Sequence, residues 1–295
     1  MMTRRKLLIA FGLGALATPL RSFAQAQGKT RRVGPDAAPP GVEAAGKVYR
    51  IGVLETTSLG LNAANFDAFR RGLRELGYTE GKNLVIEYRS AEGRGERFPD
   101  LAAELVRLKV DVIVTRGTPA LMVASKFAAA IPVVMAAIGE PPGRGIVASL
   151  AHPGGNVTGL SAFVTELTGK RLEMLKELAP RVTRVATLFN MGNPIFPGQW
   201  QEIQSAAKSM GIRPQLLDVR KPEELGPAFD EAVKQRANGL VVGIDALMQA
   251  NGKAIVGLAA KHRLPAIYAS REFVDAGGLI SYGVSYPDLY YRAAG

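Results

Sequence analysis

The sequence predicts an α/β protein built from two similar lobes, each a parallel sheet with helices on both faces. Short apolar, β-rich segments alternate with segments whose apolar residues have helical spacing, as in parallel strands joined by crossover helices. This alternation stops at a loop rich in Gly and Pro, residues 139–156, and then starts again. The second run repeats the spacing of the first, since Ile51 to Gly77 and Val185 to Gly211 both span 26 residues.

The first lobe is expected to hold four strands and three helices. Strands are predicted where apolar residues form short runs, at 51–54, 84–88, 110–114 and 132–136. Apolar residues from Phe66 to Leu76 recur at helical spacing and Gly77 follows them, so a helix is predicted at 65–76. The same spacing predicts helices at 101–108 and 120–130.

After residue 156 the pattern predicts a second set of elements. The strands are expected at 157–163, 184–189, 215–219, 239–244, 264–268 and 279–283. The helices are expected at 167–178, 199–210, 225–233 and 253–262, with a last one beginning at Asp288. We therefore predict a first lobe at 48–157 and a second at 158–277, with 278–295 returning to the first lobe.

The N-terminus has the pattern of an export signal. Three basic residues at 4–6 precede an uncharged apolar stretch, Leu7 to Leu20, and Ala24 ends a small-x-small cleavage site. The stretch is too short to span a bilayer comfortably. We predict a cleaved signal peptide at 1–24, a flexible leader at 25–47 and a periplasmic mature protein. The Arg4-Arg5 pair is compatible with both Sec and twin-arginine export.

Composition excludes several classes of site. The 295 residues contain no Cys and only two His, so disulfides, iron–sulfur clusters, Cys nucleophiles and multi-His metal sites are not expected. The net charge of +11 falls to +7 when the four basic residues of the signal peptide are removed. The remaining basic residues form no stripe with interleaved aromatic residues, so nucleic acid is not an expected partner. We predict no cofactor and no metal.

Ligands of parallel sheets bind beyond the carboxyl ends of the strands, and this rule selects short polar segments. Thr118 followed by Pro119 is typical of a helix start, whose free amides attract an anion such as a carboxylate. Asp245 ends an apolar strand and fits an ammonium group of a ligand that faces Thr118 across a cleft. Taken singly, each of these two residues is better explained as a helix cap.

Signatures of catalysis are scarce. The sequence has no G-x-S-x-G elbow, no G-x-x-x-x-G-K-[ST] loop and no H-E-x-x-H motif. His152 lies in a His-Pro-Gly-Gly turn and His262 at the end of a predicted helix, and neither has the setting of a general base. We therefore predict that the protein is not an enzyme.

Several segments together resemble the ABC transporter substrate-binding family that includes tryptophan- and tyrosine-type binding proteins. The most specific is His152-Pro-Gly-Gly-Asn-Val-Thr-Gly159. Gly117-Thr-Pro-Ala120, Gly145-Ile-Val-Ala-Ser-Leu150 and Gly277-Gly-Leu-Ile-Ser-Tyr-Gly283 also match, and the resemblance runs from about Arg50 to the C-terminus. Glu140-Pro141 stands where the family commonly has Asp-Pro, a departure that bears on ligand choice.

The resemblance implies a type I periplasmic binding protein, with two Rossmann-like lobes and a ligand in the cleft between them. It implies a monomeric solute-binding component of an ABC importer that delivers a small polar ligand, such as an amino acid, to a membrane permease with its cytoplasmic ATPase. Family members usually continue past the last predicted helix, so a C-terminally truncated chain is expected. Carried over by position, the ligand-binding residues are Thr56, Thr57, Gly117, Thr118, Glu140, Ser161, Asn190 and Asp245.

Two other classes of function remain open from the sequence. A ligand-sensing domain that signals to a membrane receptor has the same fold, and a neighbouring kinase gene favours it over a permease gene. An exported α/β enzyme is the second alternative, and turnover of a substrate by the purified protein supports it.

Overall fold

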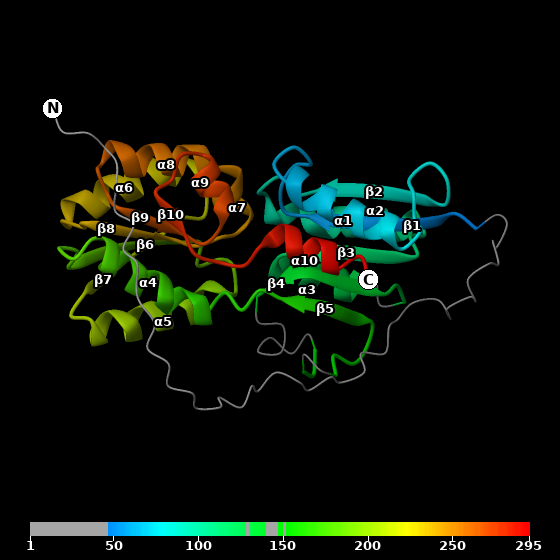
Figure 1. Cartoon of the computed structure of the whole chain (residues 1–295), viewed down its shortest axis with the longest axis horizontal. Coiled ribbons are helices and arrows are strands. Elements are labelled where there is room, and N and C mark those ends of the chain that lie inside the picture. The colour runs from blue at the N-terminus through cyan, green and yellow to red at the C-terminus, as the bar shows by residue number, and fades with distance from the viewer. Residues whose placement is uncertain (1–46, 128–129, 140–146, 150–151) are drawn as a thin grey trace, which may run out of the picture. The chain divides into compact units, whose positions relative to one another are not determined.

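The computed structural model describes residues 47–127, 130–139, 147–149 and 152–295, which form two five-stranded sheets (Figure 1). The predicted signal peptide at 1–24, the predicted leader apart from Lys47, and Glu140 lie outside the described residues. The paired strands of both sheets run parallel, as predicted.

The first sheet contains five strands in the order β2-β1-β3-β4-β5. Their bounds are β1 Tyr49–Glu55, β2 Leu84–Ser90, β3 Val112–Arg116, β4 Val133–Ile138 and β5 Val157–Ser161. The helices that follow β1, β2 and β3 are α1 Ala63–Glu75, α2 Phe98–Arg107 and α3 Thr118–Phe127, with the short 3-10 helix η1 Gly95–Arg97 before α2. Gly52 of β1 pairs with Glu87 of β2 on one side and with Ile113 of β3 on the other.

Neighbouring residues of β1 build cores on opposite faces of this sheet. Leu54 packs in one cluster with Leu105 of α2 and with the buried face of α3. Val53 packs in a second cluster with Phe66 of α1 and with Tyr290 of the C-terminal helix, α10 Tyr286–Arg292. Both faces of the sheet are therefore covered, which explains why the central strands β3 and β4 are mostly apolar rather than alternating, whereas the edge strands β2 and β5 carry more polar residues.

The second sheet has the order β10-β9-β8-β6-β7. Its strands are β6 Arg184–Phe189, β7 Arg213–Asp218, β8 Gly239–Val242, β9 Ala266–Tyr268 and β10 Ile280–Ser281. Its helical elements are α4 Glu166–Leu178, α5 Phe196–Ser209, η3 Pro222–Glu224, α6 Leu225–Lys234, α7 Ala246–Ala250, α8 Gly252–Lys261 and α9 Arg271–Asp275. Helices α6 and α8 pack with Leu188 on one face, and α4 and α5 pack with Phe189 on the other (Figure 1).

The two sheets, whose similarity the sequence spacing predicts, have the same strand order. The order β2-β1-β3-β4-β5 of the first sheet corresponds to β7-β6-β8-β9-β10 in the second. The helix that connects β1 to β2 and the helix that connects β6 to β7 also end in the same way, because Gly77 and Gly211 follow α1 and α5 with φ of +89° and +65°. Such left-handed glycines are the usual stop of an α-helix.

The structure differs from the predicted organisation in three places. Strand β5 pairs with β4, so residues 158–161 belong to the first sheet although the predicted boundary put them in the second lobe. Strand β10 pairs with β9 in the second sheet, and α10 is the part of 278–295 that packs on the core of the first. The short helices α7 and α9 were not predicted. Within the described ranges, no helix is both long and apolar enough to cross a membrane.

Candidate ligand-binding site

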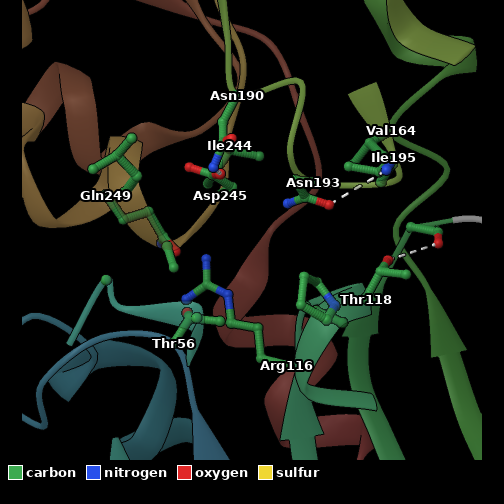
Figure 2. Close-up of a pocket in the computed structure, with 18 of the residues that line it drawn as sticks. Thr56, Arg116, Thr118, Val164, Asn190, Asn193, Ile195, Ile244, Asp245 and Gln249 are labelled. Carbon is green, nitrogen blue, oxygen red and sulfur yellow. Dashed lines mark hydrogen bonds between the residues drawn. The ribbon is translucent and has the colours of Figure 1, made fainter. Parts of the chain in front are cut away.

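A cavity of about 290 Å³ lies where strands of both sheets end (Figure 2). Its lining residues lie at or beyond the carboxyl ends of β1, β2, β3, β4, β5, β6 and β8, the position at which α/β sheets bind ligands, and Tyr286 of α10 joins them. Both sheets belong to one compact unit of the chain. The volume is near the lower end of the range for small-molecule pockets, about 300–1,000 Å³.

The cavity brings together five of the eight predicted site residues. These are Thr56, Gly117, Thr118, Asn190 and Asp245. Thr57 and Ser161 are not among its lining residues, and Glu140 lies outside the described residues. The carbonyl of Thr57 accepts a hydrogen bond from the Tyr88 hydroxyl at 3.0 Å, and the Ser161 hydroxyl accepts one from the amide of Phe163 at 3.3 Å.

Gly117, and not Thr118, caps helix α3. Its carbonyl accepts the first helical hydrogen bond, from the amide of Leu121 at 3.1 Å, and its φ is +85°. Thr118 is the first residue of the helix, and its hydroxyl donates to the carbonyl of Gly139 at 3.2 Å (Figure 2). The expectation that Thr118 caps the helix is therefore wrong; its side chain instead links α3 to the end of β4.

Replacing Gly117 by Ala is expected to lower the free energy of unfolding by about 2 kcal/mol, because a Cβ is strained at positive φ and also crowds a neighbour. The new Cβ would lie 3.0 Å from Cγ2 of Thr56. Gly77→Ala is the matched control, since its φ is also positive but nothing lies within 4 Å of its Cβ. Urea unfolding of both variants measures the difference, and an equal loss in the two would show that the Thr56 contact costs nothing.

Arg116 lines the cavity but was not among the ligand-binding residues expected from the sequence. It ends β3, is only 4% exposed, and its guanidinium stacks 4.1 Å from the ring centre of Tyr286. Its Nη1 donates to Oδ1 of Asn62 at 3.3 Å. The side-chain oxygen of Gln249 on α7, turned toward the guanidinium, accepts from Nη2 at 2.5 Å and from Nη1 at 3.2 Å. The signal in the sequence was a charged residue closing the apolar strand before Gly117.

A buried carboxyl group lies beneath this guanidinium. Glu55 ends β1 and is 1% exposed, and it accepts hydrogen bonds from the Tyr290 hydroxyl and, at 3.0 Å, from the amide of Thr56. Burial raises the pKa of Glu55 to about 7, although the positive charge of Arg116 and the hydrogen bonds act in the opposite direction. A buried carboxyl group with a pKa near neutral therefore lies next to the cavity-lining residue Thr56, although Glu55 does not itself line the cavity.

Asp245 caps α7 and holds Asn190. Its Oδ1 accepts from the amide of Met248 at 2.9 Å, and its Oδ2 accepts from Nδ2 of Asn190 at 2.8 Å. Burial raises the pKa of the Asp245 carboxyl, and hydrogen bonds from the Met248 amide, Asn190 and Asn193 oppose that rise. The helix cap that the sequence predicts for Asp245 is thus present, and its second partner, Asn190, directly follows β6.

The rest of the lining is largely apolar. Val164, Ile195 and Ile244 form part of the wall, and Asn193 lies beside them with its Oδ1 accepting from the amide of Ile195 at 3.3 Å (Figure 2). A Cβ on Gly139 would lie 1.8 Å from Cδ1 of Ile195, so only glycine lets this side chain approach the end of β4. The cavity thus pairs a cationic group with apolar walls, an arrangement that suits a small molecule with one polar end.

No group of three or more His, Asp or Glu residues in the described part of the chain is placed to hold a metal ion. Of the described lining residues, Asp245 and Arg116 are the charged ones. Asp245 is occupied as a helix cap, and a guanidinium does not act as a base at ordinary pH. The chemistry that these groups offer is hydrogen bonding and charge pairing.

Comparison with known proteins identifies the family of the chain. The family model described as ABC transporter substrate binding protein matches residues 50–295. A tyrosine-binding protein from Clostridioides difficile strain R20291 is 27% identical over 225 residues, which are 76% of this chain and 64% of that protein. The chain therefore spans slightly less than two thirds of the length of that relative.

Two solved structures have the same fold. An ABC domain in complex with L-Trp from Streptococcus pneumoniae and a conserved domain protein from Vibrio cholerae each have a TM-score of 0.77 and 25% sequence identity. Each comparison covers 84% of this chain and 83% of the other. Together with the two parallel sheets, this likeness confirms the predicted type I periplasmic binding protein architecture. Because the family match extends from Arg50 to Gly295, the chain belongs to the ABC transporter substrate-binding protein family.

Proposed function

We propose that the protein is the extracytoplasmic solute-binding component of an ABC importer. The observation that carries this proposal is the cavity of about 290 Å³, bounded by strand ends of both sheets and containing a buried guanidinium. A ligand in such a cavity contacts both lobes at once, which is what a cleft-closing binding protein requires. The protein then binds its ligand without transforming it and presents the closed form to a membrane permease.

The relatives indicate the size of the ligand. One is a tyrosine-binding protein and another was solved with L-Trp, so an amino acid or a related small compound is the first candidate for this chain. Gly117 and Thr118 are proposed to contact an anionic group, with Thr56 and Asn190 as neutral hydrogen-bonding groups. Thr57, Ser161 and Glu140 remain proposals from the family resemblance alone.

Export is proposed from the N-terminal sequence. A basic start, an apolar stretch and a cleavage site at Ala24 have the order of a signal peptide, and the family acts outside the cytoplasm. We therefore place the mature protein in the periplasm, where it delivers ligand to its permease.

A thermal-shift screen tests the proposal. The purified protein is heated with L-tyrosine, L-tryptophan, other amino acids, small carboxylates, sugars and polyamines in parallel. A ligand that binds only the native state stabilises it by about 2.7 kcal/mol at 100 times its dissociation constant. We expect one chemical class to raise the melting temperature, with calorimetry confirming one site per chain. A cooperative transition that no class raises, or turnover of a compound, contradicts the proposal.

A further inference from the structure

Arg116 is a buried cation whose charge the described protein groups compensate poorly. The ion pair it forms with a described carboxylate, to Oε1 of Glu272, is 3.9 Å long, and the Glu272 side chain is 37% exposed. Glu55 lies beneath it, but that carboxyl is held by Tyr290 and its pKa is raised to about 7. A guanidinium taken out of water in this way is stabilised strongly by an anion that can accept two parallel hydrogen bonds.

A neutral amide occupies the position where such an anion would bind. With its side-chain amide turned so that the oxygen faces the guanidinium, Gln249 accepts from both terminal nitrogens of Arg116, at 2.5 and 3.2 Å, as a carboxylate oxygen would. Gln249 lies on α7, a helix of five residues, and its side chain is partly exposed at the cavity (Figure 2). A carboxylate at this place replaces a neutral hydrogen bond by a charge-assisted one, which is about twice as strong.

Asp245 is the acidic residue of the described lining, and protein groups already donate hydrogen bonds to its carboxylate. Asp245 already receives hydrogen bonds from the Met248 amide and from Asn190, one on each oxygen. Asn193 and the amide of Leu247 also act on it and lower its pKa. An ionised carboxylate has about four acceptor positions, and both oxygens of Asp245 already accept from protein donors, which leaves less room for an ammonium group.

We propose that this cavity binds a small organic acid with an apolar body, whose carboxylate displaces the Gln249 amide from the Arg116 guanidinium, and that an amino group on the ligand is not required. The apolar body lies against Val164, Ile195 and Ile244. Val164 and Ile195 are on the other side of the cavity from Gln249, and Ile244 lies beside Asn190 and Asp245 (Figure 2). This proposal rests on the proposed function, since it names the ligand class of the same site.

Three compounds with one ring system separate the contributions of the two polar groups. L-Tryptophan carries both a carboxylate and an ammonium group, indole-3-propanoate only the carboxylate, and tryptamine only the ammonium group. Isothermal titration calorimetry on the full chain measures each dissociation constant. We expect indole-3-propanoate to bind at least as tightly as L-tryptophan, and tryptamine to bind about 10- to 100-fold more weakly, the range for a charge-assisted hydrogen bond.

Substitutions of Arg116 test whether its guanidinium binds the carboxylate of the ligand. Arg116→Gln should weaken indole-3-propanoate binding about 10- to 100-fold and remove its advantage over tryptamine. Arg116→Lys, which keeps the charge but not the paired donors, should fall between wild type and Arg116→Gln. Gln249→Ala should tighten binding, because the competing amide is gone. Arg89→Gln is the control: Arg89 lies on β2, pairs with Glu104 at 2.8 Å and does not line the cavity, so its variant should bind as wild type does.

The analogue series needs no variant, so a poorly folded Arg116→Gln protein leaves the proposal testable. Tighter binding of tryptamine than of indole-3-propanoate overturns the ligand class, as does tenfold tighter binding of L-tryptophan than of indole-3-propanoate. Equal affinity of wild type and Arg116→Lys or Arg116→Gln for the acid overturns the role of Arg116. If a sugar or polyamine binds instead, the binding function stands and the acid proposal fails. If no compound in the wider screen binds, the proposed binding function and the proposed ligand class both fail.

Discussion

The free energy of unfolding of wild type is expected to fall as the pH rises from about 4.5 to about 7, and the Glu55→Gln variant is expected not to show this fall. Burial raises the pKa of this carboxyl from its usual value of 4.5 to about 7 in the folded protein. Between these two values the folded state holds a proton that the unfolded state has released. The free energy of unfolding therefore falls with rising pH across this window and is level above it.

The size of the effect follows from the shift. A shift from 4.5 to about 7 corresponds to a ceiling of about 3 kcal/mol, lost progressively across the window. The charged group that faces Glu55 is Arg116 from β3, and the titratable hydroxyls near it are those of Tyr290 from α10 and Tyr88 from β2, with Thr56 donating its amide. Arg116 opposes the rise, so the net direction depends on burial being the largest cause.

Urea unfolding at pH 5 and at pH 8 measures this difference directly. Glu55→Gln keeps the volume of the side chain and one acceptor oxygen, so it should match wild type at pH 5 and exceed it at pH 8. Glu223→Gln is the matched control, because Glu223 is exposed on η3, and its profile should run parallel to wild type. A profile of Glu55→Gln that also runs parallel to wild type would show that the buried carboxyl does not titrate in this window.

The sequence was sufficient for the sheets because their signal is local. Apolar strands and helical spacing are properties of a few consecutive residues, and the repeat of spacing predicted two similar α/β lobes. The strand order that the two sheets share was not predicted, because it depends on long-range pairing. The helices α7 and α9 were missed because five residues are too few for a periodic pattern. The boundary after residue 157 was misplaced because the pairing of β5 with β4 is a long-range contact.

The sequence predicted the position of the site but not the buried guanidinium that it contains. The strand-end rule placed Thr56, Gly117, Asn190 and Asp245 at one cavity, since it depends only on the direction of parallel strands. It did not distinguish Arg116 from an exposed charge. The burial of Arg116 depends on Asn62, Tyr286 and Gln249, which come from three separate segments that only the fold brings together.

Replacing Asp245 by Ala is expected to lower the free energy of unfolding by about 2–3 kcal/mol, through loss of the α7 cap and of the bond to Asn190. The amide of Met248 and Nδ2 of Asn190 lose their acceptors, and both groups lie in a partly buried setting. Because α7 carries Gln249 and Asn190 lines the cavity, ligand affinity should fall as well.

Asp245→Asn separates a positioning role from direct contact with a ligand ammonium group. The amide of Asn keeps one oxygen for the Met248 cap but sets a donor against Nδ2 of Asn190, so the loss of stability should be smaller, about 1 kcal/mol. If Asp245 only positions α7 and Asn190, Asp245→Asn weakens L-tryptophan and indole-3-propanoate by the same factor. If it contacts the ammonium group, the substitution weakens L-tryptophan alone. Equal factors by calorimetry therefore make Asp245 a helix cap that holds the cavity in shape, and Arg116 its charge-recognising group.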